Sequence, residues 1–194
     1  MTTRVDGGQI KDGDITEAKL QTLINPTAQV SNNAFNIGVL GFKLAVNDGL
    51  TVFNLVDGVV DEFHDNTGVD TSESSNATYD ASADTFSNST TSMTLISDTF
   101  TANTTPSTAR IVLFAELPDG TSDFTISVTR DNSTFNNITL TDEGYQAGSS
   151  GIKIFSGSTS LTGSSSPQVQ VRWRIVGSSL TGTNKIHGVS LQWK

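Results

Sequence analysis

The sequence predicts a mainly β protein: a C-terminal antiparallel β-sandwich, jelly-roll-like, behind an extended N-terminal arm that carries one short helix. Polar and apolar residues alternate best in the run VQVRWRIV, where the apolar side chains share one parity, namely Val169, Val171, Trp173 and Ile175. Turn residues separate such runs at short intervals, as in sandwiches. Hydrophobic residues make up only 35% of the 194 residues, but 10 Phe and many Val, Ile and Thr remain, which favours strands over disorder.

Residues 1–33 form the predicted arm. Asp14 and Glu17 fit a capping box at the start of a helix, and Asn25-Pro26 ends it. A helix of roughly ten residues is marginal alone in water, so we expect it to dock on its own domain, a sister chain or a neighbouring protein. The apolar residues expected to attach the arm are Ile10, Ile15, Leu20, Leu23 and Ile24.

Residues 34–92 are predicted to hold a hairpin followed by an extended acidic linker or assembly region. Asn47-Asp48-Gly49 is a hairpin turn signal between FKLAV and LTVFNLV, so two strands are preferred, with a helix over 34–46 as the alternative. Residues 65–92 show no period and few large apolar side chains. This pattern is typical of a linker, and we expect it to run over the surface of another subunit.

Residues 93–194 form the predicted sandwich domain. Strands are expected at Met93–Ala102, Arg110–Glu116, Asp123–Arg130, Asn136–Leu140, Gly151–Ser156, Gln168–Val176 and Lys185–Trp193. In the last of these, His187 shares the parity of Val189 and Leu191, so a core histidine is expected there.

Composition argues against several functional classes. The net charge is −9 and the pI is near 4.4, which opposes binding to nucleic acid or to an anionic membrane surface. Because the chain has no cysteine, it has neither a disulfide framework nor a thiolate zinc site. The start, MTTRVDGGQ, lacks the pattern of a secretory signal, and no apolar run reaches the length of a membrane span. We therefore expect a protein made in a cytoplasm, without membrane insertion.

No catalytic, cofactor-binding or metal-binding residue is predicted. Eight carboxylates cluster in one stretch, namely Asp57, Asp61, Glu62, Asp65, Asp70, Glu73, Asp80 and Asp84. A solvated acidic surface is the preferred interpretation, with a calcium site or a glycosidase pair as alternatives, since the stretch lacks EF-hand spacing.

The basic and imidazole side chains also favour structural roles. The histidines, His64 and His187, have no G-x-S-x-G partner motif and no H-x-x-x-H spacing. Arg172 and Arg174 take the outward parity of their strand, where solvated charge is the preferred interpretation. Pairing with an acidic face of a neighbour, or binding of a sugar acid, is the alternative.

Three regions of the sequence, the last of them made of three separate stretches, resemble segments of tailed-bacteriophage virion structural proteins. GGQIKDGDITEAKL is similar to N-terminal attachment segments of fibres, and FNLVDGVVDEFHDNTGVDTSESSNATYD to a segment of virion proteins from environmental phages. FTISVTRDNSTFNNITLTDEG, VRWRIV and KIHGVSLQW resemble a terminal β-sandwich of such proteins, with Phe135 standing where relatives carry Trp.

The resemblance implies a non-enzymatic virion protein without catalytic residues or cofactors. The preferred role is a fibre or adhesin-like appendage, attached by its arm and presenting the sandwich for host contact. Capsid decoration (a cement protein) is the alternative, followed by a polysaccharide depolymerase or a free carbohydrate-binding module. The implied partners are other virion proteins (capsid, portal, tail or fibre subunits), sister chains in a homotrimer, and a host-surface glycan.

Overall fold

The computed structural model describes residues 52–55 and 57–194, all of which belong to the compact unit formed by residues 38–194. The predicted arm, its helix over 14–24, the turn at Asn47-Asp48-Gly49 and the alternative helix over 34–46 lie outside the described residues. The predicted attachment residues are also outside them, namely Ile10, Ile15, Leu20, Leu23 and Ile24.

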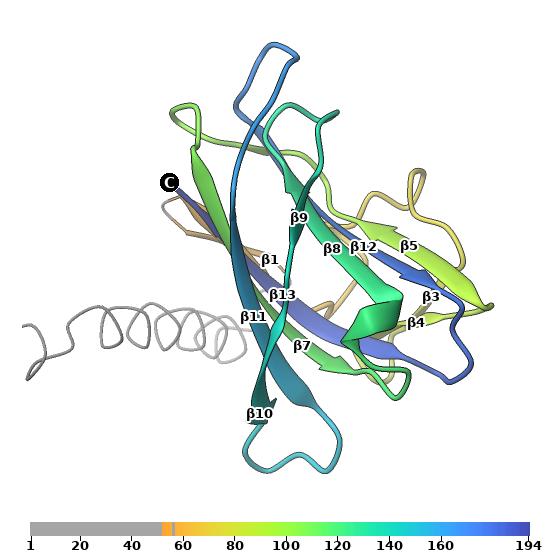
Figure 1. The fold of residues 1–194 in the computed structure, drawn as a ribbon. Helices are drawn as coiled ribbons and strands as arrows, with labels where there is room; N and C mark the ends of the chain where they lie inside the picture. Colours follow the sequence, from red (N-terminus) through yellow and green to blue (C-terminus); the bar gives the residue numbers. More distant parts are fainter. Residues whose placement is uncertain (1–51, 56) are drawn as a thin grey trace, which may run out of the picture. The chain divides into compact units, whose positions relative to one another are not determined.

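The described residues form two antiparallel sheets, which confirms the predicted fold class (Figure 1). The larger sheet has the order β1-β2-β13-β7-β11-β10, with β1 Val52–Leu55, β2 Gly58–Asp61, β13 Lys185–Trp193, β7 Thr108–Glu116, β11 Lys153–Ser160 and β10 Thr141–Tyr145. The smaller sheet has the order β5-β12-β8-β9, with β5 Ser92–Ile96, β12 Gln170–Ser178, β8 Phe124–Thr129 and β9 Asn136–Ile138. The short β6, Phe100–Thr101, also pairs with β12, and a 3-10 turn, Thr121–Asp123, precedes β8.

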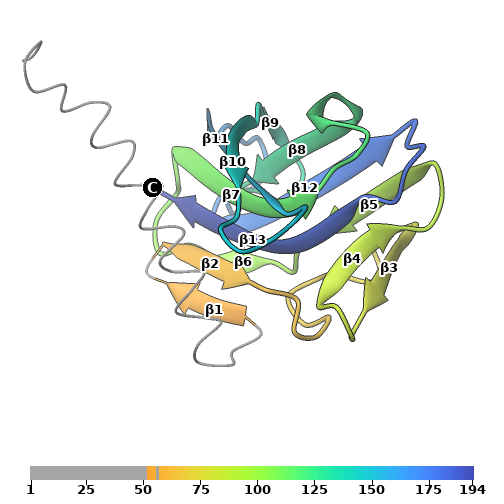
Figure 2. The same ribbon diagram turned by 90° about the horizontal axis from the view of Figure 1, so that it is seen from below.

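A hairpin closes one side of the sandwich. It consists of β3, Ala77–Asp80, and β4, Thr85–Asn88, and it joins the larger sheet where β4 pairs with β13. Figure 2 shows the hairpin beside β5 of the smaller sheet. Isolated bridges between Ser75 and Thr94 and between Val69 and Ser97 tie the preceding segment to the same region of the smaller sheet.

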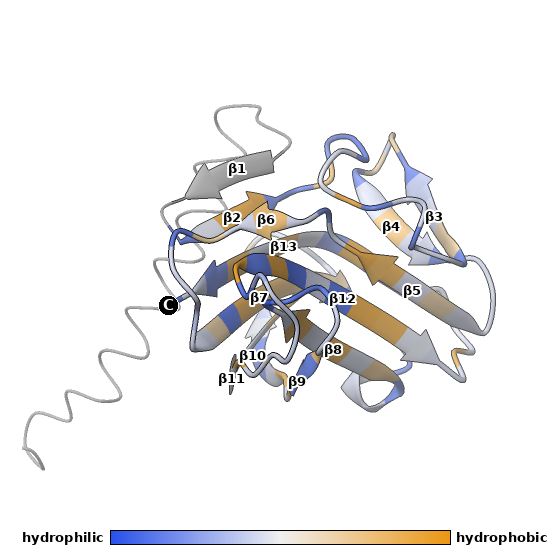
Figure 3. Cartoon of the chain, turned by 90° about the horizontal axis from the view of Figure 1, so that it is seen from above, coloured by the Kyte–Doolittle hydropathy of each residue, from blue (hydrophilic) through white to orange (hydrophobic). Residues whose placement is uncertain are grey.

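Alternating apolar side chains from both sheets form the core, and bands of hydrophobic residues run along β5, β8 and β12 (Figure 3). Trp173 is fully buried, and its ring centroid lies 6.2 Å from that of Phe63. The rings of Phe63 and Phe86 pack edge to face, with their centroids 5.0 Å apart. These three rings come from β12, from the residues after β2, and from β4. The aromatic contacts therefore join the N-terminal strands to the sandwich.

The segment predicted as an extended acidic linker is part of this sandwich. Residues 65–92 contribute β3 and β4, and β4 pairs with β13 at Lys185↔Ser87 and Ile186↔Phe86. β2, which lies just before this segment, pairs with β13 from Val189↔Asp61 to Gln192↔Gly58. The segment lacks periodicity because its strands are short and are joined by turns in which an aspartate accepts the backbone N–H two residues on. Asp65, Asp70 and Asp80 form such turns, each followed at that position by Thr or Ser.

The predicted exposure of Arg172 and the predicted direction of His187 are wrong. Arg172 has the predicted outward parity but is only 2% exposed, because loop residues from 70–73 and Asn132 cover it. His187 leaves the core because the pairing of β13 with β7 shifts register between Ile186 and Gly188. This bulge reverses the parity, so Ile186 and Val189 both face the core and His187 does not.

The predicted strand Met93–Ala102 is divided into β5 and β6, the other strands from residue 93 on agree with prediction apart from their ends, and β10 is an addition. The sequence of β10, TDEGY, does not alternate, and the strand lies at the edge of the larger sheet with mostly exposed side chains. An ion pair of 2.7 Å between Asp142 and Lys153 joins β10 to β11. The strand is thus held by a cross-strand ion pair, and the sequence gives no alternating pattern from which β10 could be predicted.

Candidate functional site

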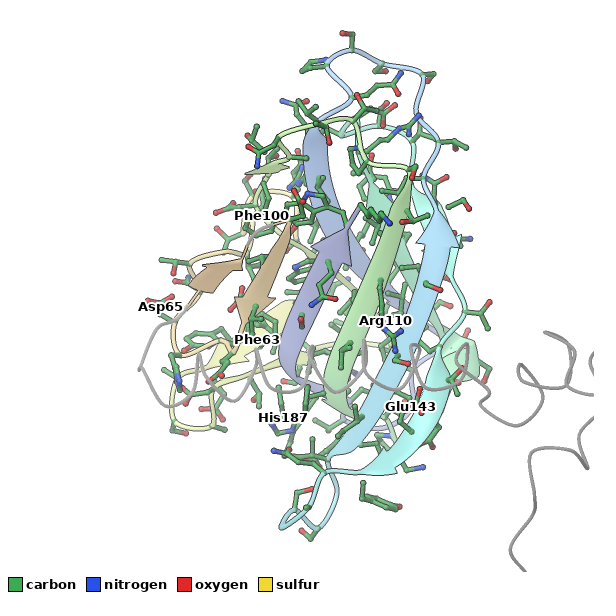
Figure 4. All side chains as sticks on the ribbon, turned by 90° about the vertical axis from the view of Figure 1, so that its left-hand side faces the viewer. Phe63, Asp65, Phe100, Arg110, Glu143 and His187 are labelled. Atoms are coloured by element: carbon green, nitrogen blue, oxygen red, sulfur yellow. The ribbon has the colours of Figure 1, made fainter. Side chains whose placement is uncertain are left out.

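The candidate site lies on the outer face of the larger sheet, the face turned away from the smaller sheet. On β7, Ile111 and Leu113 face the core, so Arg110 and Val112 beside them face outward. Figure 4 looks onto this outer face and labels Arg110, Glu143 and His187 on it. The site therefore consists of side chains from neighbouring strands, positioned by the register of the sheet.

A groove of about 580 Å³ occupies the end of this face where β13 finishes and β7 starts. Strand register places Ser158, Arg110 and Gln192 side by side on β11, β7 and β13. The lining residues are Thr108, Ala109, Arg110, Ser158, Thr159, Ser160, Gln192, Trp193 and Lys194. We call this feature the cationic groove.

The chemistry of the cationic groove differs from that of the chain as a whole. The chain carries a net charge of −9, yet the described lining residues include two cations and no Asp or Glu. A guanidinium group donates in a planar fork that matches a carboxylate or sulfate, and hydroxyl and amide groups supply further donors and acceptors. Trp193 adds an aromatic side chain, packed partly against the core. These lining side chains together suit an anionic ligand that carries hydroxyl groups and also has an apolar face.

A second depression, of about 190 Å³, lies near the opposite end of β13 and brings both histidines of the chain together. His64 lies between two carboxylates, with Nε2 3.1 Å from Glu62 Oε2 and Nδ1 3.0 Å from Asp84 Oδ2. His187 Nε2 lies 2.9 Å from Glu116 Oε1. Since a neutral imidazole has one N–H, only the imidazolium form of His64 can donate to both carboxylates.

The depression that His64 and His187 line is assembled only by the fold. The two histidines are separated by most of the folded chain, and no local spacing predicts their approach. Among residues 57–194, no group of three or more His, Asp or Glu side chains is arranged to hold a metal ion. The lining residues contain no Ser, Thr or Cys to serve as a nucleophile within the described part of the chain.

The acidic stretch is only partly the solvated surface that the sequence favours. Asp61 and Glu62 are buried, and Asp70 and Glu73 pair with Arg172 at 2.8 Å each. The guanidinium group of Arg172 also donates to the carbonyl of Ser97 at 2.7 Å. Arg172 thus pairs with acidic residues of its own chain, and neither a neighbour's acidic face nor a sugar acid is needed to account for it.

Asp61 is the most perturbed carboxyl of this stretch. Burial raises its pKa to about 8, against an opposing hydrogen bond from the backbone N–H of Phe63 at 3.0 Å, and the charges of Asp65 and Asp98 raise it further. Its Oδ2 atom is buried and has no hydrogen-bond partner among the described residues. The side chain is therefore held in its neutral form around neutral pH.

Two other aspartates fix the loops at the ends of the sandwich. Burial opposes ionisation of Asp131, but backbone N–H donors, including Thr134 and Ser165, hold the pKa of Asp131 well below its usual range. Hydrogen bonds from the side chains of Thr181 and Asn184 likewise hold the pKa of Asp119 well below its usual range. These carboxylates are occupied by their own loops, so they are structural residues rather than ligand-binding ones.

Comparison with known proteins identifies no family. No family model matches the sequence, and no curated protein matches it. Among solved structures, the described fold is similar to the enzymatically active domain of tailspike protein 4 of bacteriophage CBA120, with a TM-score of 0.35 and 13% identity. The match covers 57% of this chain and 15% of that one, so this chain spans a small part of that protein. No helix within residues 57–194 has the length and apolarity that crossing a membrane requires.

Proposed function

We propose that this chain is a non-enzymatic structural protein of a phage virion, a fibre or adhesin-like appendage whose sandwich contacts a host-surface glycan. The observation that carries the glycan contact is the cationic groove, where Arg110 and Lys194 are lined up with hydroxyl and amide side chains and Trp193 at one end of the larger sheet. The virion role is supported by the resemblance of three regions of the sequence to phage virion proteins and by an acidic, cysteine-free composition.

The groove points to an acidic saccharide as ligand. A polyanionic glycan is repelled by a chain of net charge −9, so binding depends on local positive charge. Arg110 and Lys194 supply that charge, which acts over one Debye length, about 8 Å at physiological salt. Uronate or sulfate groups fit the Arg110 guanidinium, and a sugar ring can pack on an exposed part of Trp193.

The remaining parts of the proposal concern assembly. The N-terminal arm, through Ile10, Ile15, Leu20, Leu23 and Ile24, attaches the chain to other virion proteins such as capsid, portal, tail or fibre subunits. The sandwich is presented as a homotrimer, the assembly that the resemblance to phage virion proteins implies, and such a closed symmetric assembly would bury sheet edges.

Glycan binding is tested on the full chain with an array of neutral, uronate-containing and sulfated glycans. The expected result is salt-sensitive binding to acidic glycans, reduced at least tenfold by Arg110→Gln and less by Lys194→Gln. Arg174→Gln is the matched control, because Arg174 lies on β12 of the smaller sheet, where it stacks on Phe135 at 3.7 Å. Equal binding by the parent chain and Arg110→Gln would contradict the proposed groove.

Attachment is tested by deleting residues 1–33 and measuring incorporation into particles. The deletion should leave a soluble sandwich that no longer joins the virion. Incorporation at the parent level would show that the arm is not the attachment segment.

Imaging of labelled particles separates the two structural roles. A few copies at the tail or at vertices support the fibre role, whereas many copies over the shell indicate capsid decoration. Release of reducing sugar from host polysaccharide by the purified chain would show a depolymerase and contradict the non-enzymatic proposal.

A further inference from the structure

His64 joins two segments that lie apart in the sequence. Its Nδ1 atom lies 3.0 Å from Oδ2 of Asp84, and its Nε2 atom lies 3.1 Å from Oε2 of Glu62. Glu62 directly follows β2 of the larger sheet, whereas Asp84 is the last residue of the turn between β3 and β4. The imidazole therefore connects the end of β2 to the turn of the hairpin. We call this pair of contacts the histidine latch.

Other contacts hold the body of the hairpin. β4 pairs with β13 at Phe86 and Ser87. The hydroxyl of Tyr79 on β3 donates to the carbonyl of Phe63 at 2.8 Å, and the ring centroids of Phe63 and Phe86 lie 5.0 Å apart. These contacts do not depend on the protonation of a histidine, so the hairpin body stays on the sandwich whichever form His64 takes.

The turn of the hairpin, residues 81–84, is held differently. The backbone N–H groups of Ser82 and Ala83 both donate to Asp80, at 2.9 and 3.3 Å, so these hydrogen bonds stay within the hairpin. Asp84 has a left-handed backbone, with φ of 51°, and its carboxylate contacts His64 outside the hairpin. Among the described residues, the histidine latch is thus the polar contact that fixes the turn to the end of β2.

We propose that the histidine latch is a proton-operated device, which fixes the turn of the β3–β4 hairpin in mildly acidic medium and releases it in alkaline medium. The imidazolium form of His64 donates to both carboxylates, whereas the neutral ring donates to one and turns a lone pair toward the other. An oxygen lone pair at this distance repels that of the ring, so one of the two contacts opens. The proposal is independent of the proposed function, because it concerns only how the hairpin is held.

The pH range of the device follows from the chemistry of histidine, whose charge changes in the range between pH 5 and 8. The contacts of the latch stabilise the ordered turn while the ring is protonated, and this stabilisation is lost as the pH rises and the proton leaves. The body of the hairpin has its own contacts, so the expected change is local. It is a release of the turn rather than unfolding of the sandwich.

The other titratable groups near the latch have partners of their own. His187, which lines the same depression, and Lys185 both face Glu116 of β7, at 2.9 and 4.0 Å. Three nearby aspartates each accept the backbone N–H two residues further along the chain. These aspartates are Asp61, Asp65 and Asp80, and their donors are Phe63, Thr67 and Ser82. The hydroxyl of Tyr79 is bonded to the Phe63 carbonyl.

The test is nuclear magnetic resonance of the full-length chain, in which His64 and His187 are the two imidazoles. Nitrogen-15 shifts give the protonation of each ring, and relaxation of the Cα–H bonds of residues 81–84 gives their order parameters. At pH 5.5 both ring nitrogens of His64 should be protonated, and the turn should have order parameters of about 0.85, as in a rigid backbone. At pH 8.5 one nitrogen should have lost its proton, and the order parameters should fall below about 0.6.

Three variants separate the latch from other causes. His64→Leu removes both donors, so the turn should be mobile at both pH values. His187→Leu is the matched control, because His187 contacts Glu116 and not the hairpin, and the pH dependence of the turn should persist. Asp84→Asn suits the left-handed backbone, and its amide can accept from the protonated ring or donate to the neutral one. The turn of Asp84→Asn should therefore stay ordered at both pH values.

Each result decides for or against the latch. A turn that is equally ordered at pH 5.5 and 8.5 in the parent chain overturns the proposal. A pH dependence that survives in His64→Leu, or that disappears in His187→Leu, overturns it as well. So does a neutral His64 ring beside an ordered turn at pH 5.5, because the proton would then reside elsewhere. If His64→Leu does not fold, Asp84→Asn decides, and loss of order in that variant at pH 8.5 contradicts the latch.

Discussion

Arg172 and Asp70, 102 residues apart in the sequence, form an ion pair in which Nη2 lies 2.8 Å from Oδ2. The guanidinium is almost fully buried and also contacts Glu73 and Asn132 at 2.8 and 2.9 Å. This contact fixes the loop before β3 against a strand of the smaller sheet. The acidic segment is thereby held by its own chain, and the charge of Arg172 is satisfied within the fold.

Replacing Arg172 should therefore destabilise the sandwich strongly. Arg172→Met leaves Asp70 and Glu73 without their cation and removes a bond to the Ser97 carbonyl, with an expected loss of about 2–3 kcal/mol in the free energy of unfolding. Urea denaturation followed by tryptophan fluorescence measures it. Arg174→Met, on the same strand but partly exposed, is the control and should cost no more than about 1–2 kcal/mol through its contact with Phe135. Equal losses in the two variants would show that the ion pair is not the cause.

Asp61→Asn should stabilise the protein at alkaline pH. The folded pKa of about 8 lies above the unfolded value of 3.8, so the folded state holds a proton that the unfolded state releases. The contribution of this group to stability is fully present below about pH 4, falls as the pH rises to about 8, and is constant above it. We expect Asp61→Asn to raise the free energy of unfolding by about 1–3 kcal/mol at pH 8.5 and to flatten its pH dependence.

Thermal unfolding of Asp61→Asn between pH 4 and 9 provides the measurement. Asp57→Asn is the matched control, because Asp57 is exposed and its left-handed backbone, with φ of 55°, suits asparagine. An unchanged pH slope in Asp61→Asn would mean that Asp61 is ionised in the folded protein.

Asp131→Asn should loosen two loops at once. The Oδ1 atom of Asp131 accepts from the backbone N–H groups of Ser133 and Thr134, and Oδ2 accepts from those of Ser164 and Ser165. An amide nitrogen in place of one oxygen cannot accept, so about 2–3 kcal/mol of stability should be lost at pH 7. Because the folded pKa is depressed, the stabilising effect is present above about pH 4 and is lost only as the pH falls through the lower folded value.

Hydrogen exchange of the amides of 133, 134, 164 and 165 is the direct readout for Asp131→Asn. These amides should exchange faster in the variant while those of β12 stay protected. Asp123→Asn, whose carboxylate lies in the partly exposed turn before β8, is the control. Unchanged exchange at all four amides would show that Asp131 does not hold the loops.

Gly157→Ala should be destabilising because the two sheets approach closely at this point. A Cβ atom at Gly157 would lie 2.4 Å from Ile138 Cγ2 and 2.5 Å from the carbonyl oxygen of Thr139. Overpacking of this kind costs about 1–3 kcal/mol, measured by urea denaturation. Gly151→Ala is the matched control, since its nearest neighbour is the flexible end of Glu116 at 3.2 Å. A neutral Gly157→Ala would mean that β9 can move away from β11 without cost.

The sequence by itself determined the fold class and most strands after residue 93. Alternation along β12 placed Val171, Trp173 and Ile175 in the core correctly, because side chains of a strand point to opposite faces with a period of two. The same rule assigned Arg172 to solvent, and there it failed, because periodicity gives the direction of a side chain but not what covers it. For Arg172 the cover is a loop about one hundred residues earlier in the chain.

Only the tertiary structure decided the place of residues 57–92 and the composition of the candidate site. Short strands joined by Asp-x-Ser/Thr turns have too few residues for a period, and pairing with β13 recruits them into the sheet. The bulge at Ile186 and Gly188 turned His187 out of the core and beside Glu116, and the register of β7, β11 and β13 assembled the cationic groove around Arg110. Such contacts depend on which strands become neighbours, and that is set by the free energy of the whole packed sandwich rather than by any local run of residues.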